Sequence, residues 1–242
     1  MEQFSKNDKD KNNIASYIQF TKIGPGVTRE EILDHLELCK RYQFQAAMIA
    51  PCWITLAREI LQGTNVKVAS FIDFGMGNAN VYGKLALLDS LLKLGVDEVD
   101  FAPNMGYLLS GMYDDFQDES KVLVQEAGEI PVKAMLQLGM IKEKSEKVRA
   151  IRLLEDAGVD WIKNSSGGWP PGATNATVED IRLIREAIRG DSRIKASGGI
   201  KTYDQAIALI RAGAKLLGTS SGVEIVSKSK HHLDDPKLSK DY

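Results

Sequence analysis

The sequence has little of what several protein classes require. Its 242 residues include two cysteines, Cys39 and Cys52, with no CxxC motif and no cysteine paired with histidine at a zinc-binding spacing, so we exclude a disulfide framework. No apolar run approaches the ~20 residues that a membrane-spanning helix needs. The first thirteen residues, MEQFSKNDKDKNN, contain no apolar segment like that of a secretory signal. We therefore expect a cytoplasmic protein that has no membrane partner.

An excess of charge of one sign is also missing. Lysine and arginine together number 31 and aspartate and glutamate 33, which gives a net charge of −2. Such a chain has no broad electrostatic attraction to nucleic acid or anionic lipid, so we expect no nucleic-acid partner. The glycine-rich motifs GxGxxG and GxxxxGKS/T are absent as well, so nothing supports a nucleotide-binding fold.

The two ends of the chain are polar, whereas the part between them has the composition of a globular domain. Residues 1–13 and 227–242 are charged and have too few apolar residues to pack. No linker rich in serine, glycine or proline interrupts the rest. We predict one domain over residues 14–226 between two polar tails. The last residue, Tyr242, either belongs to a disordered tail or folds over the domain.

Short apolar segments alternate with amphipathic ones along this domain. Several of the short segments end in glycine, proline, serine or asparagine, as buried strands do. We predict strands at residues 17–21, 46–50, 66–73, 97–103, 131–139, 160–165, 193–199 and 214–220. Helical patterns lie between them; Gly158 is predicted to end one helix and Thr177 to cap the start of the next. Eight strands and eight helices in alternation predict a single-domain α/β fold, the (β/α)8 TIM barrel, rather than a doubly wound open sheet with fewer strands.

The alternation of side chains along a strand places two lysines inside the barrel. Ile162 suits the layer of helices, which leaves its neighbour Lys163 facing inward, and the same test turns Lys195 inward on the next strand. Neighbouring strands lie about 4.8 Å apart, so we expect the two lysines to be close together. Burial and a neighbouring ammonium disfavour the charged form of a lysine, which is how a Schiff-base lysine is activated. The alternative is a structural network in which both lysines pair with carboxylates such as Glu98 and Asp100.

Other inward-facing residues could act beside the two lysines. Asp100 has the inward parity near the end of its strand, so it could accept and return protons, and a plain salt bridge is the alternative. Lys133 and Gln137 face inward on the following strand by the same alternation. Asp73 ends the third predicted strand but is a weaker candidate, because the segment that begins there, DFGMGNAN, is also typical of a turn.

Three glycine-containing turns indicate a phosphate site. They follow the sixth, seventh and eighth predicted strands, at residues 165–168, 197–199 and 218–222. Barrels that bind phosphorylated substrates often use the loops after strands seven and eight together with the N-terminus of a short helix. Glycines let backbone N–H groups approach an anion, and a helix after residue 222 would present its positive end to it. The alternative is that these are tight turns without a ligand.

Several of these segments resemble one protein family. The runs VDWIKNSSGG, GATNATVEDIRLIRE, IKASGGIKTYDQAIALIRAGAKLLGTSSGVEIV and DEVDFAPNMGYLLSGMYDDF are similar to segments of the deoxyribose-phosphate aldolase family, and a weaker resemblance extends back to residue 14. The resemblance implies a class I aldolase on a TIM barrel, without metal or other cofactor, and suggests a homodimer. It makes Lys163 the Schiff-base lysine, Lys195 the second lysine that perturbs it, and Asp100 the acid that works with a water as proton shuttle. The family's phosphate-binding positions correspond to Ser166, Gly167, Gly198, Gly199, Ser220 and Ser221.

The sequence departs from the family at three motifs. The family's DHT corresponds to Gln19-Phe20-Thr21, its ETG to Gln137-Leu138-Gly139 and its GFP to Asp73-Phe74-Gly75. Two carboxylates are thereby replaced by amides, and a new charge is added at Asp73. We expect these changes to bear on substrate recognition and to leave the Schiff-base lysine unaffected. The candidate substrate contacts are Thr21, Asp73, Lys133 and Gln137.

Together these observations predict an aldolase for phosphorylated sugars. The expected reaction cleaves 2-deoxy-D-ribose 5-phosphate to D-glyceraldehyde 3-phosphate and acetaldehyde through an imine on Lys163, so the expected partner is a small phosphorylated sugar. One alternative is a related lysine-dependent aldolase or thiolase of the same superfamily that acts on a different phosphorylated sugar. The other is a non-catalytic barrel that binds phosphosugars and forms no imine.

Overall fold

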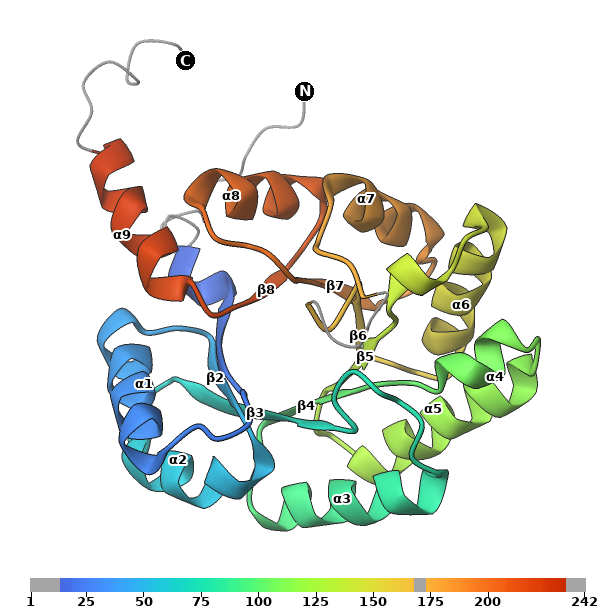
Figure 1. Cartoon of the computed structure of the whole chain (residues 1–242), viewed down its shortest axis with the longest axis horizontal. Coiled ribbons are helices and arrows are strands. Elements are labelled where there is room, and N and C mark those ends of the chain that lie inside the picture. The colour runs from blue at the N-terminus through green and yellow to red at the C-terminus, as the bar shows by residue number, and fades with distance from the viewer. Residues whose placement is uncertain (1–13, 168–172, 234–242) are drawn as a thin grey trace.

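Eight parallel strands form a closed barrel (Figure 1). The structure, a computed structural model, describes residues 14–167 and 173–233. Each strand pairs with the next one along the chain, and β1 pairs with β8 to close the ring. The strands are β1 (Ile18–Lys22), β2 (Ala46–Ile49), β3 (Lys67–Ile72), β4 (Glu98–Phe101), β5 (Val132–Met135), β6 (Trp161–Lys163), β7 (Arg193–Ser197) and β8 (Leu216–Thr219). Each of them overlaps a segment predicted as a strand, so the predicted (β/α)8 barrel is confirmed.

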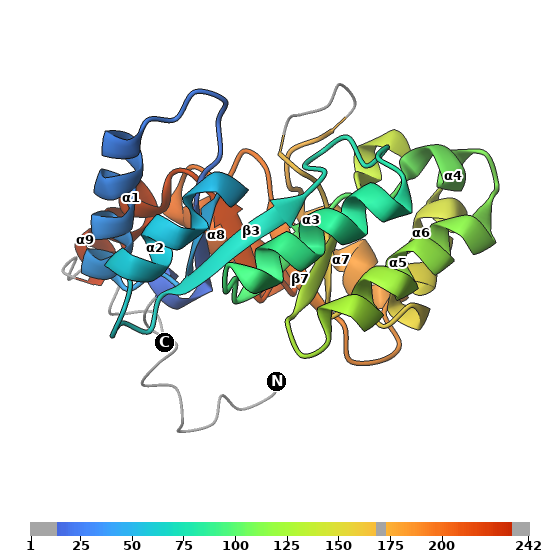
Figure 2. The same cartoon turned by 90° about the horizontal axis from the view of Figure 1, so that it is seen from below.

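Helices surround the barrel, as the two views in Figures 1 and 2 show. The α-helices are α1 (Arg29–Tyr42), α2 (Ile54–Ile60), α3 (Val81–Lys93), α4 (Met105–Leu109), α5 (Tyr113–Ala127), α6 (Lys144–Asp156), α7 (Val178–Ala187), α8 (Tyr203–Ala212) and α9 (Gly222–Leu233), and the 3-10 helices are η1 (Ile14–Tyr17), η2 (Pro51–Trp53) and η3 (Leu138–Met140). One α-helix follows each strand except β4, which is followed by α4 and α5. The short helix α4 is therefore an addition to the eight that were predicted. Over the two described ranges, no helix is long and apolar enough to cross a membrane.

Local signals in the sequence set where helices begin and end. The Thr28 side chain caps α1 by accepting a hydrogen bond from the backbone N–H of Glu31, whose carboxylate accepts one from the N–H of Thr28. Thr177 caps α7 by accepting from the N–H of Asp180. Gly158 follows α6 with φ +86°, a left-handed conformation that glycine adopts without strain. The predicted helix boundaries at Gly158 and Thr177 are confirmed.

The main hydrophobic core lies between the strands and the helices, whereas the barrel interior is largely polar. Ile162, predicted to face the helices, belongs to this core. A second, small apolar cluster lies inside the barrel and consists of Ala46, Met48 and Ala69. Other interior positions carry buried polar side chains: Gln19, Glu98, Asp100, Lys133, Lys163 and Lys195. Because such groups are costly to bury without partners, their contacts with one another decide what the interior can do.

The described chain extends beyond the predicted end of the domain. Helix α9 continues past residue 226 to Leu233. The predicted N-terminal tail, residues 1–13, and the last part of the predicted C-terminal tail, residues 234–242 with Tyr242, lie outside the described residues, as does the segment 168–172. The domain boundaries therefore stay predictions.

Candidate active site

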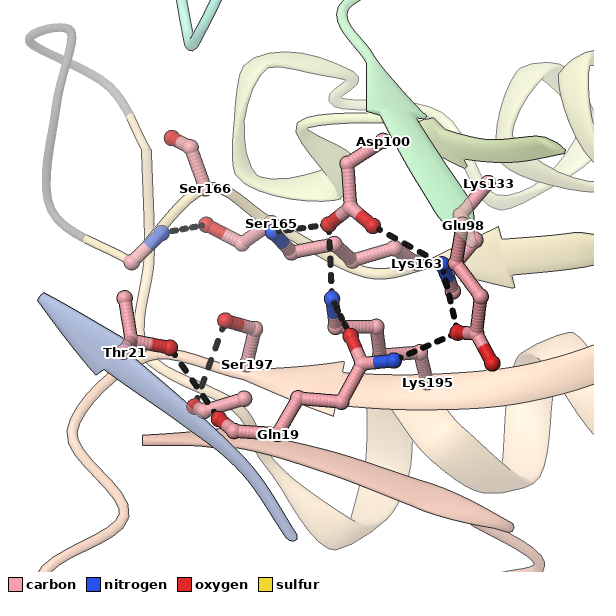
Figure 3. Close-up of polar contacts among 12 residues, drawn as sticks. Gln19, Thr21, Glu98, Asp100, Lys133, Lys163, Ser165, Ser166, Lys195 and Ser197 are labelled. Atoms are coloured by element: carbon pink, nitrogen blue, oxygen red, sulfur yellow. Dashed lines mark hydrogen bonds and ion pairs between the residues drawn. The ribbon is translucent and has the colours of Figure 1, made fainter. Parts of the chain in front are cut away.

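Two lysines and one aspartate meet inside the barrel. Lys163 and Lys195 are adjacent because they are paired residues on the neighbouring strands β6 and β7. Asp100 reaches both from β4: its Oδ2 accepts a hydrogen bond from Lys163 Nζ at 2.9 Å and one from Lys195 Nζ at 2.7 Å (Figure 3). All three side chains are buried. The predicted inward orientation of these residues is confirmed, as is the proximity expected of the two lysines.

More charges lie next to this cluster inside the barrel. Lys133 Nζ lies 2.8 Å from Glu98 Oε2 and 3.4 Å from Asp100 Oδ1, so its ammonium is enclosed between two carboxylates. Lys67, which is half exposed, places its Nζ 2.6 Å from Glu98 Oε1. The structural network of lysines and carboxylates considered as an alternative is thus present together with the adjacent lysine pair. Lys133, a predicted substrate contact, is fully buried within this network.

Burial and charge together perturb the titration of the interior groups. Burial alone would raise the pKa of the Asp100 carboxyl, but the three neighbouring ammonium groups hold that pKa well below its usual range. Burial acts in the same way on Glu98, but the ammonium groups of Lys133 and Lys67 together outweigh it, so the pKa of Glu98 falls to about 2. The pKa of Lys195 is lowered to about 7, mainly by burial. The repulsion of the Lys163 ammonium also lowers this pKa, whereas the attraction of the Asp100 carboxylate raises it. Lys195 can therefore take up and release a proton near neutral pH.

A cavity of about 750 Å³ lies at the C-terminal ends of the strands, where barrel enzymes hold their substrates. Loops that follow β1, β6, β7 and β8 contribute to its lining, and Thr21 lies at its edge on β1. The predicted phosphate-binding residues all line it: Ser166, Gly167, Gly198, Gly199, Ser220 and Ser221. The three turns that were predicted separately therefore converge on one cavity.

The lysine pair lies directly beneath this cavity. A Cβ atom on the cavity residue Gly218 would come within 3.3 Å of Lys195 Cε and 2.8 Å of Ser197 Oγ. Phe74, which also lines the cavity, has its ring centroid 5.5 Å from Lys163 Nζ. Cavity and lysines thus form one site, in which Gly218 leaves the space above Lys195 open and Phe74 covers Lys163.

Two further predicted contacts hold loops in place. The buried Gln137 accepts a hydrogen bond at Oε1 from the backbone N–H of Ser166 (3.1 Å) and donates from Nε2 to Ser166 Oγ (2.7 Å). Asp73 has φ +49°, and its Oδ2 accepts from the N–H of Ala79 at 2.7 Å within the loop after β3. Both side chains are thus engaged by the protein, and neither is among the described residues that line the cavity.

Several cavity residues were not found from the sequence. Lys22 and Lys201 add positive charge to the lining, and Asn175 packs against Gly199, where an added Cβ would lie 2.5 Å from Asn175 Cγ. Lys201 lies two residues after the Gly198-Gly199 pair that was predicted to bind phosphate, so its charge could have been noted there from the sequence. Asn175 and Phe74 carry no such signal, because their position depends on the paths of long loops. Among the described residues, no group of three or more His, Cys, Asp and Glu side chains is placed to hold a metal ion.

Comparisons with known proteins agree with this geometry. No family model matches the chain. It is 36% identical over 228 residues to the deoxyribose-phosphate aldolase of Caldanaerobacter subterraneus subsp. tengcongensis, with 93% of this chain and 97% of that one covered. It is 38% identical over 223 residues to the enzyme of the same name from Thermococcus gammatolerans, with 90% and 97% covered. The chain belongs to the deoxyribose-phosphate aldolase family. The resemblance seen in the sequence motifs is confirmed.

Solved structures of other proteins have the same fold as this chain. An aldolase called QR15 superimposes with a TM-score of 0.85 at 28% identity, over 92% of this chain and 99% of that chain. The tetrameric deoxyribose phosphate aldolase from Aeropyrum pernix has a TM-score of 0.79 at 23% identity, over 90% and 92% of the two chains, and this similarity concerns the fold.

Proposed function

We propose that this member of the family is a class I aldolase that cleaves 2-deoxy-D-ribose 5-phosphate to D-glyceraldehyde 3-phosphate and acetaldehyde. The observation that carries the proposal is that Lys163 and Lys195 share one oxygen of Asp100 beneath the cavity. Two lysines on one carboxylate oxygen allow a proton to pass between the amines over short distances. The names of the relatives support the choice of sugar.

The nucleophile in the proposed mechanism is the amine of Lys163. Lys195, whose pKa burial lowers to about 7, takes the proton of the Lys163 ammonium, and Asp100 holds the two amines together. The neutral Lys163 amine attacks the aldehyde carbon C1 of the open-chain sugar and forms a carbinolamine. Loss of water then gives a protonated imine, which draws electrons from the neighbouring bond.

Cleavage follows from this electron demand. The hydroxyl on C3 loses its proton, the C2–C3 bond breaks, and its electron pair moves into the imine to form an enamine on Lys163. The C3–C5 fragment leaves as D-glyceraldehyde 3-phosphate. The enamine takes a proton at C2, and water releases acetaldehyde and restores the lysine, so the water lost earlier is returned. In the proposal Asp100 and Lys195 carry these protons.

The phosphate of the sugar is assigned to the turns after β6, β7 and β8, which line the cavity. The glycines at 167, 198 and 199 have positive φ and present backbone without a Cβ atom of their own to the cavity. The N–H of Gly167 donates to Ser165 Oγ at 3.1 Å, and the Asn175 side chain packs against Gly199. Hydroxyls of Ser166, Ser220 and Ser221 add hydrogen-bond donors, and Lys201 adds charge. Because these groups line the cavity and the lysines lie beneath it, a phosphorylated sugar bound there would have its aldehyde within reach of Lys163.

Borohydride trapping tests the proposal. The protein is incubated with 2-deoxyribose 5-phosphate and borohydride, and the reduced adduct is located by mass spectrometry. We expect the adduct on Lys163 and none in Lys163→Leu, while Lys93→Leu, which changes an exposed lysine of α3, should trap as the wild type does. An adduct with a longer sugar phosphate alone would assign the chain to the alternative aldolase. No adduct with any carbonyl compound would favour the binding-only barrel. The homodimer and the cytoplasmic location stay predictions.

A further inference from the structure

Residue 19 lies between two charged side chains of the barrel interior, Lys195 and Glu98. Gln19, on β1, is fully buried, and its Oε1 accepts a hydrogen bond from Lys195 Nζ at 2.5 Å. Its Nε2 donates to Glu98 Oε2 at 2.6 Å and to Gln45 Oε1 at 2.8 Å. The neighbours fix this orientation, because a reversed amide would place its NH2 against an ammonium and its oxygen against a carboxylate. Figure 3 shows Gln19 joining Lys195 to Glu98.

The interior charges do not balance when all are ionised. Among the described residues, the fully interior lysines 133, 163 and 195 face two interior carboxylates, Glu98 and Asp100. The half-exposed Lys67 adds a fourth ammonium at Glu98. A buried charge without a partner is costly, and a lysine in that position relieves the cost by releasing its proton. Gln19 offers Lys195 a neutral amide oxygen and no negative charge. Lys195 is therefore the interior lysine that we expect to release its proton.

We propose that Gln19 is a positioning residue whose neutral oxygen keeps Lys195 able to exchange its proton near neutral pH. The inference rests on the proposed function, in which Lys195 takes the proton of Lys163. A carboxylate in place of the amide would make three carboxylates for the three fully interior lysines and would hold the Lys195 ammonium. Gln19 does not belong to the described residues that line the cavity, so it acts on the proton transfer and leaves sugar binding unchanged.

Among the described groups that face Lys195, Gln19 is the polar one that can be varied without altering a member of the charged cluster itself. Asp100 faces Lys195 from β4, Lys163 from β6 and Lys133 from β5, and each belongs to the charged cluster itself. On β8, the neighbour on the other side, Lys195 pairs with the apolar Leu216, and Gly218 lies next to its Cε. On β2 and β3 the interior residues Met48 and Ala69 are apolar.

Two variants of residue 19 that differ in charge but not in side-chain length test the effect of charge alone. Gln19→Asp introduces a carboxylate, and Gln19→Asn introduces an amide of the same length without charge. An opposite charge within about 4–6 Å shifts a titration by about 1–3 pH units, so the neutral fraction of Lys195 near pH 7 should fall about 5-fold or more in Gln19→Asp relative to Gln19→Asn. A purely structural role for Gln19 would affect the two variants equally.

Two readouts on the full chain test the inference. NMR of isotopically labelled lysine side chains follows the titration of Lys195 without any substrate, and the pH dependence of borohydride trapping at Lys163 follows proton transfer. We expect both midpoints to be at least about one pH unit higher in Gln19→Asp than in Gln19→Asn, with KM within about two-fold. Equal midpoints in the two variants would overturn the inference.

The design distinguishes this inference from the proposed function. If the wild type forms no imine, the proposed function fails, while the NMR titration still decides whether Gln19 sets the protonation of Lys195. If the wild type traps sugar but both variants titrate alike, the role of Gln19 fails alone. Should Gln19→Asp not fold, Gln19→Glu compared with the wild type supplies the same contrast in charge at the original side-chain length, and equal midpoints there would again overturn the inference.

Discussion

The backbones of Gly167 and Gly198 pack so closely that a Cβ atom on Gly198 would lie 2.9 Å from Gly167 Cα. Gly167 has φ +95° and Gly198 φ +104°, values that side chains rarely permit. The turns after β6 and β7 can therefore meet at the cavity only because both positions are glycine. This contact brings bare backbone from two strands to the site assigned to phosphate.

Replacing Gly198 should weaken binding of the phosphorylated sugar in particular. In Gly198→Ala the new methyl group must push the two turns apart, so we expect KM for 2-deoxyribose 5-phosphate to rise at least about 10-fold, which corresponds to about 1.4 kcal/mol. Activity on 2-deoxyribose without phosphate should change little. Steady-state kinetics with both sugars measures the difference.

A second glycine provides the control for this variant. Gly63 also has positive φ, +76°, but an added Cβ meets nothing within 4 Å, and the residue lies outside the cavity lining. Gly63→Ala should cost about 1–2 kcal/mol of stability, because a residue with a Cβ atom is strained at positive φ, and it should leave KM unchanged. An unchanged KM in Gly198→Ala would show that the turn at Gly198 does not bind the phosphate.

His35 should make the fold sensitive to mild acid. It lies buried on α1, stacked on the Phe20 ring with the two centroids 4.4 Å apart, and its Nε2 is 3.2 Å from the Phe20 carbonyl oxygen. Burial lowers the pKa of His35 from 6.5 to about 4. Between these values the unfolded chain binds a proton that the folded chain does not bind, so stability falls as the pH falls through that window and is unaffected above it.

The size of this effect follows from the shift. A lowering of about 2.5 pH units corresponds to about 3 kcal/mol of unfolding free energy lost between pH 6.5 and pH 4. Urea unfolding at a series of pH values measures the free energy of unfolding as a function of pH. Between pH 6.5 and pH 4 this free energy should fall by about 3 kcal/mol less in His35→Phe than in the wild type. Carboxylates such as Glu98 titrate in both proteins and cancel in the comparison. The same pH dependence of the unfolding free energy in both proteins would contradict the lowered pKa of His35.

Lys84 should contribute far more to stability than Lys93, the other lysine of α3. Its Nζ donates to the backbone oxygens of Gly77 and Ala102 and to Glu119 Oε1, each at 2.9 Å, and the side chain is fully buried. These contacts join the loop after β3, which carries Phe74, to the loop after β4. In Lys84→Met the Glu119 carboxylate loses its buried partner, and we expect a loss of about 3–5 kcal/mol in the free energy of unfolding.

Lys93, on the same helix, provides the comparison. It forms an ion pair with Asp89 at 2.7 Å, but its side chain is 74% exposed. Lys93→Met should therefore change the free energy of unfolding by about 1 kcal/mol or less. Denaturant unfolding of the two variants measures the contrast. Similar losses in both would mean that the Lys84 contacts add no more than a surface pair.

The face on which each strand residue lies could be predicted from the sequence, since it depends on the two-residue period of a strand. Ile162 beside Lys163 decided the orientation of β6, and the same reasoning oriented Asp100 on β4. The glycine turns could be found because each is a local signal. The functional roles assigned to these residues remain predictions.

The partners of the interior residues could not be predicted in this way. We expected the change at residue 19 to bear on substrate recognition, yet Gln19 contacts Lys195 and Glu98 inside the barrel. Such a contact depends on how far each side chain reaches across a closed ring of strands. The Lys84–Glu119 pair joins two helices, so no single segment indicates it. The helix α4 was missed because five residues are too few to show a helical period.

The hydrogen bond between Gln19 and Lys195 joins residues that are 176 positions apart. The first strand of the barrel pairs with the last, so β1 has its second neighbour only after β8 has been made. A nascent chain on the ribosome can form the early helices and strands, but it lacks Lys195 and the closing strand until most of its length has emerged. The reactive amines therefore acquire their complete surroundings only after β8 has been made, and a chain terminated before residue 195 holds Lys163 without the neighbour that would take its proton.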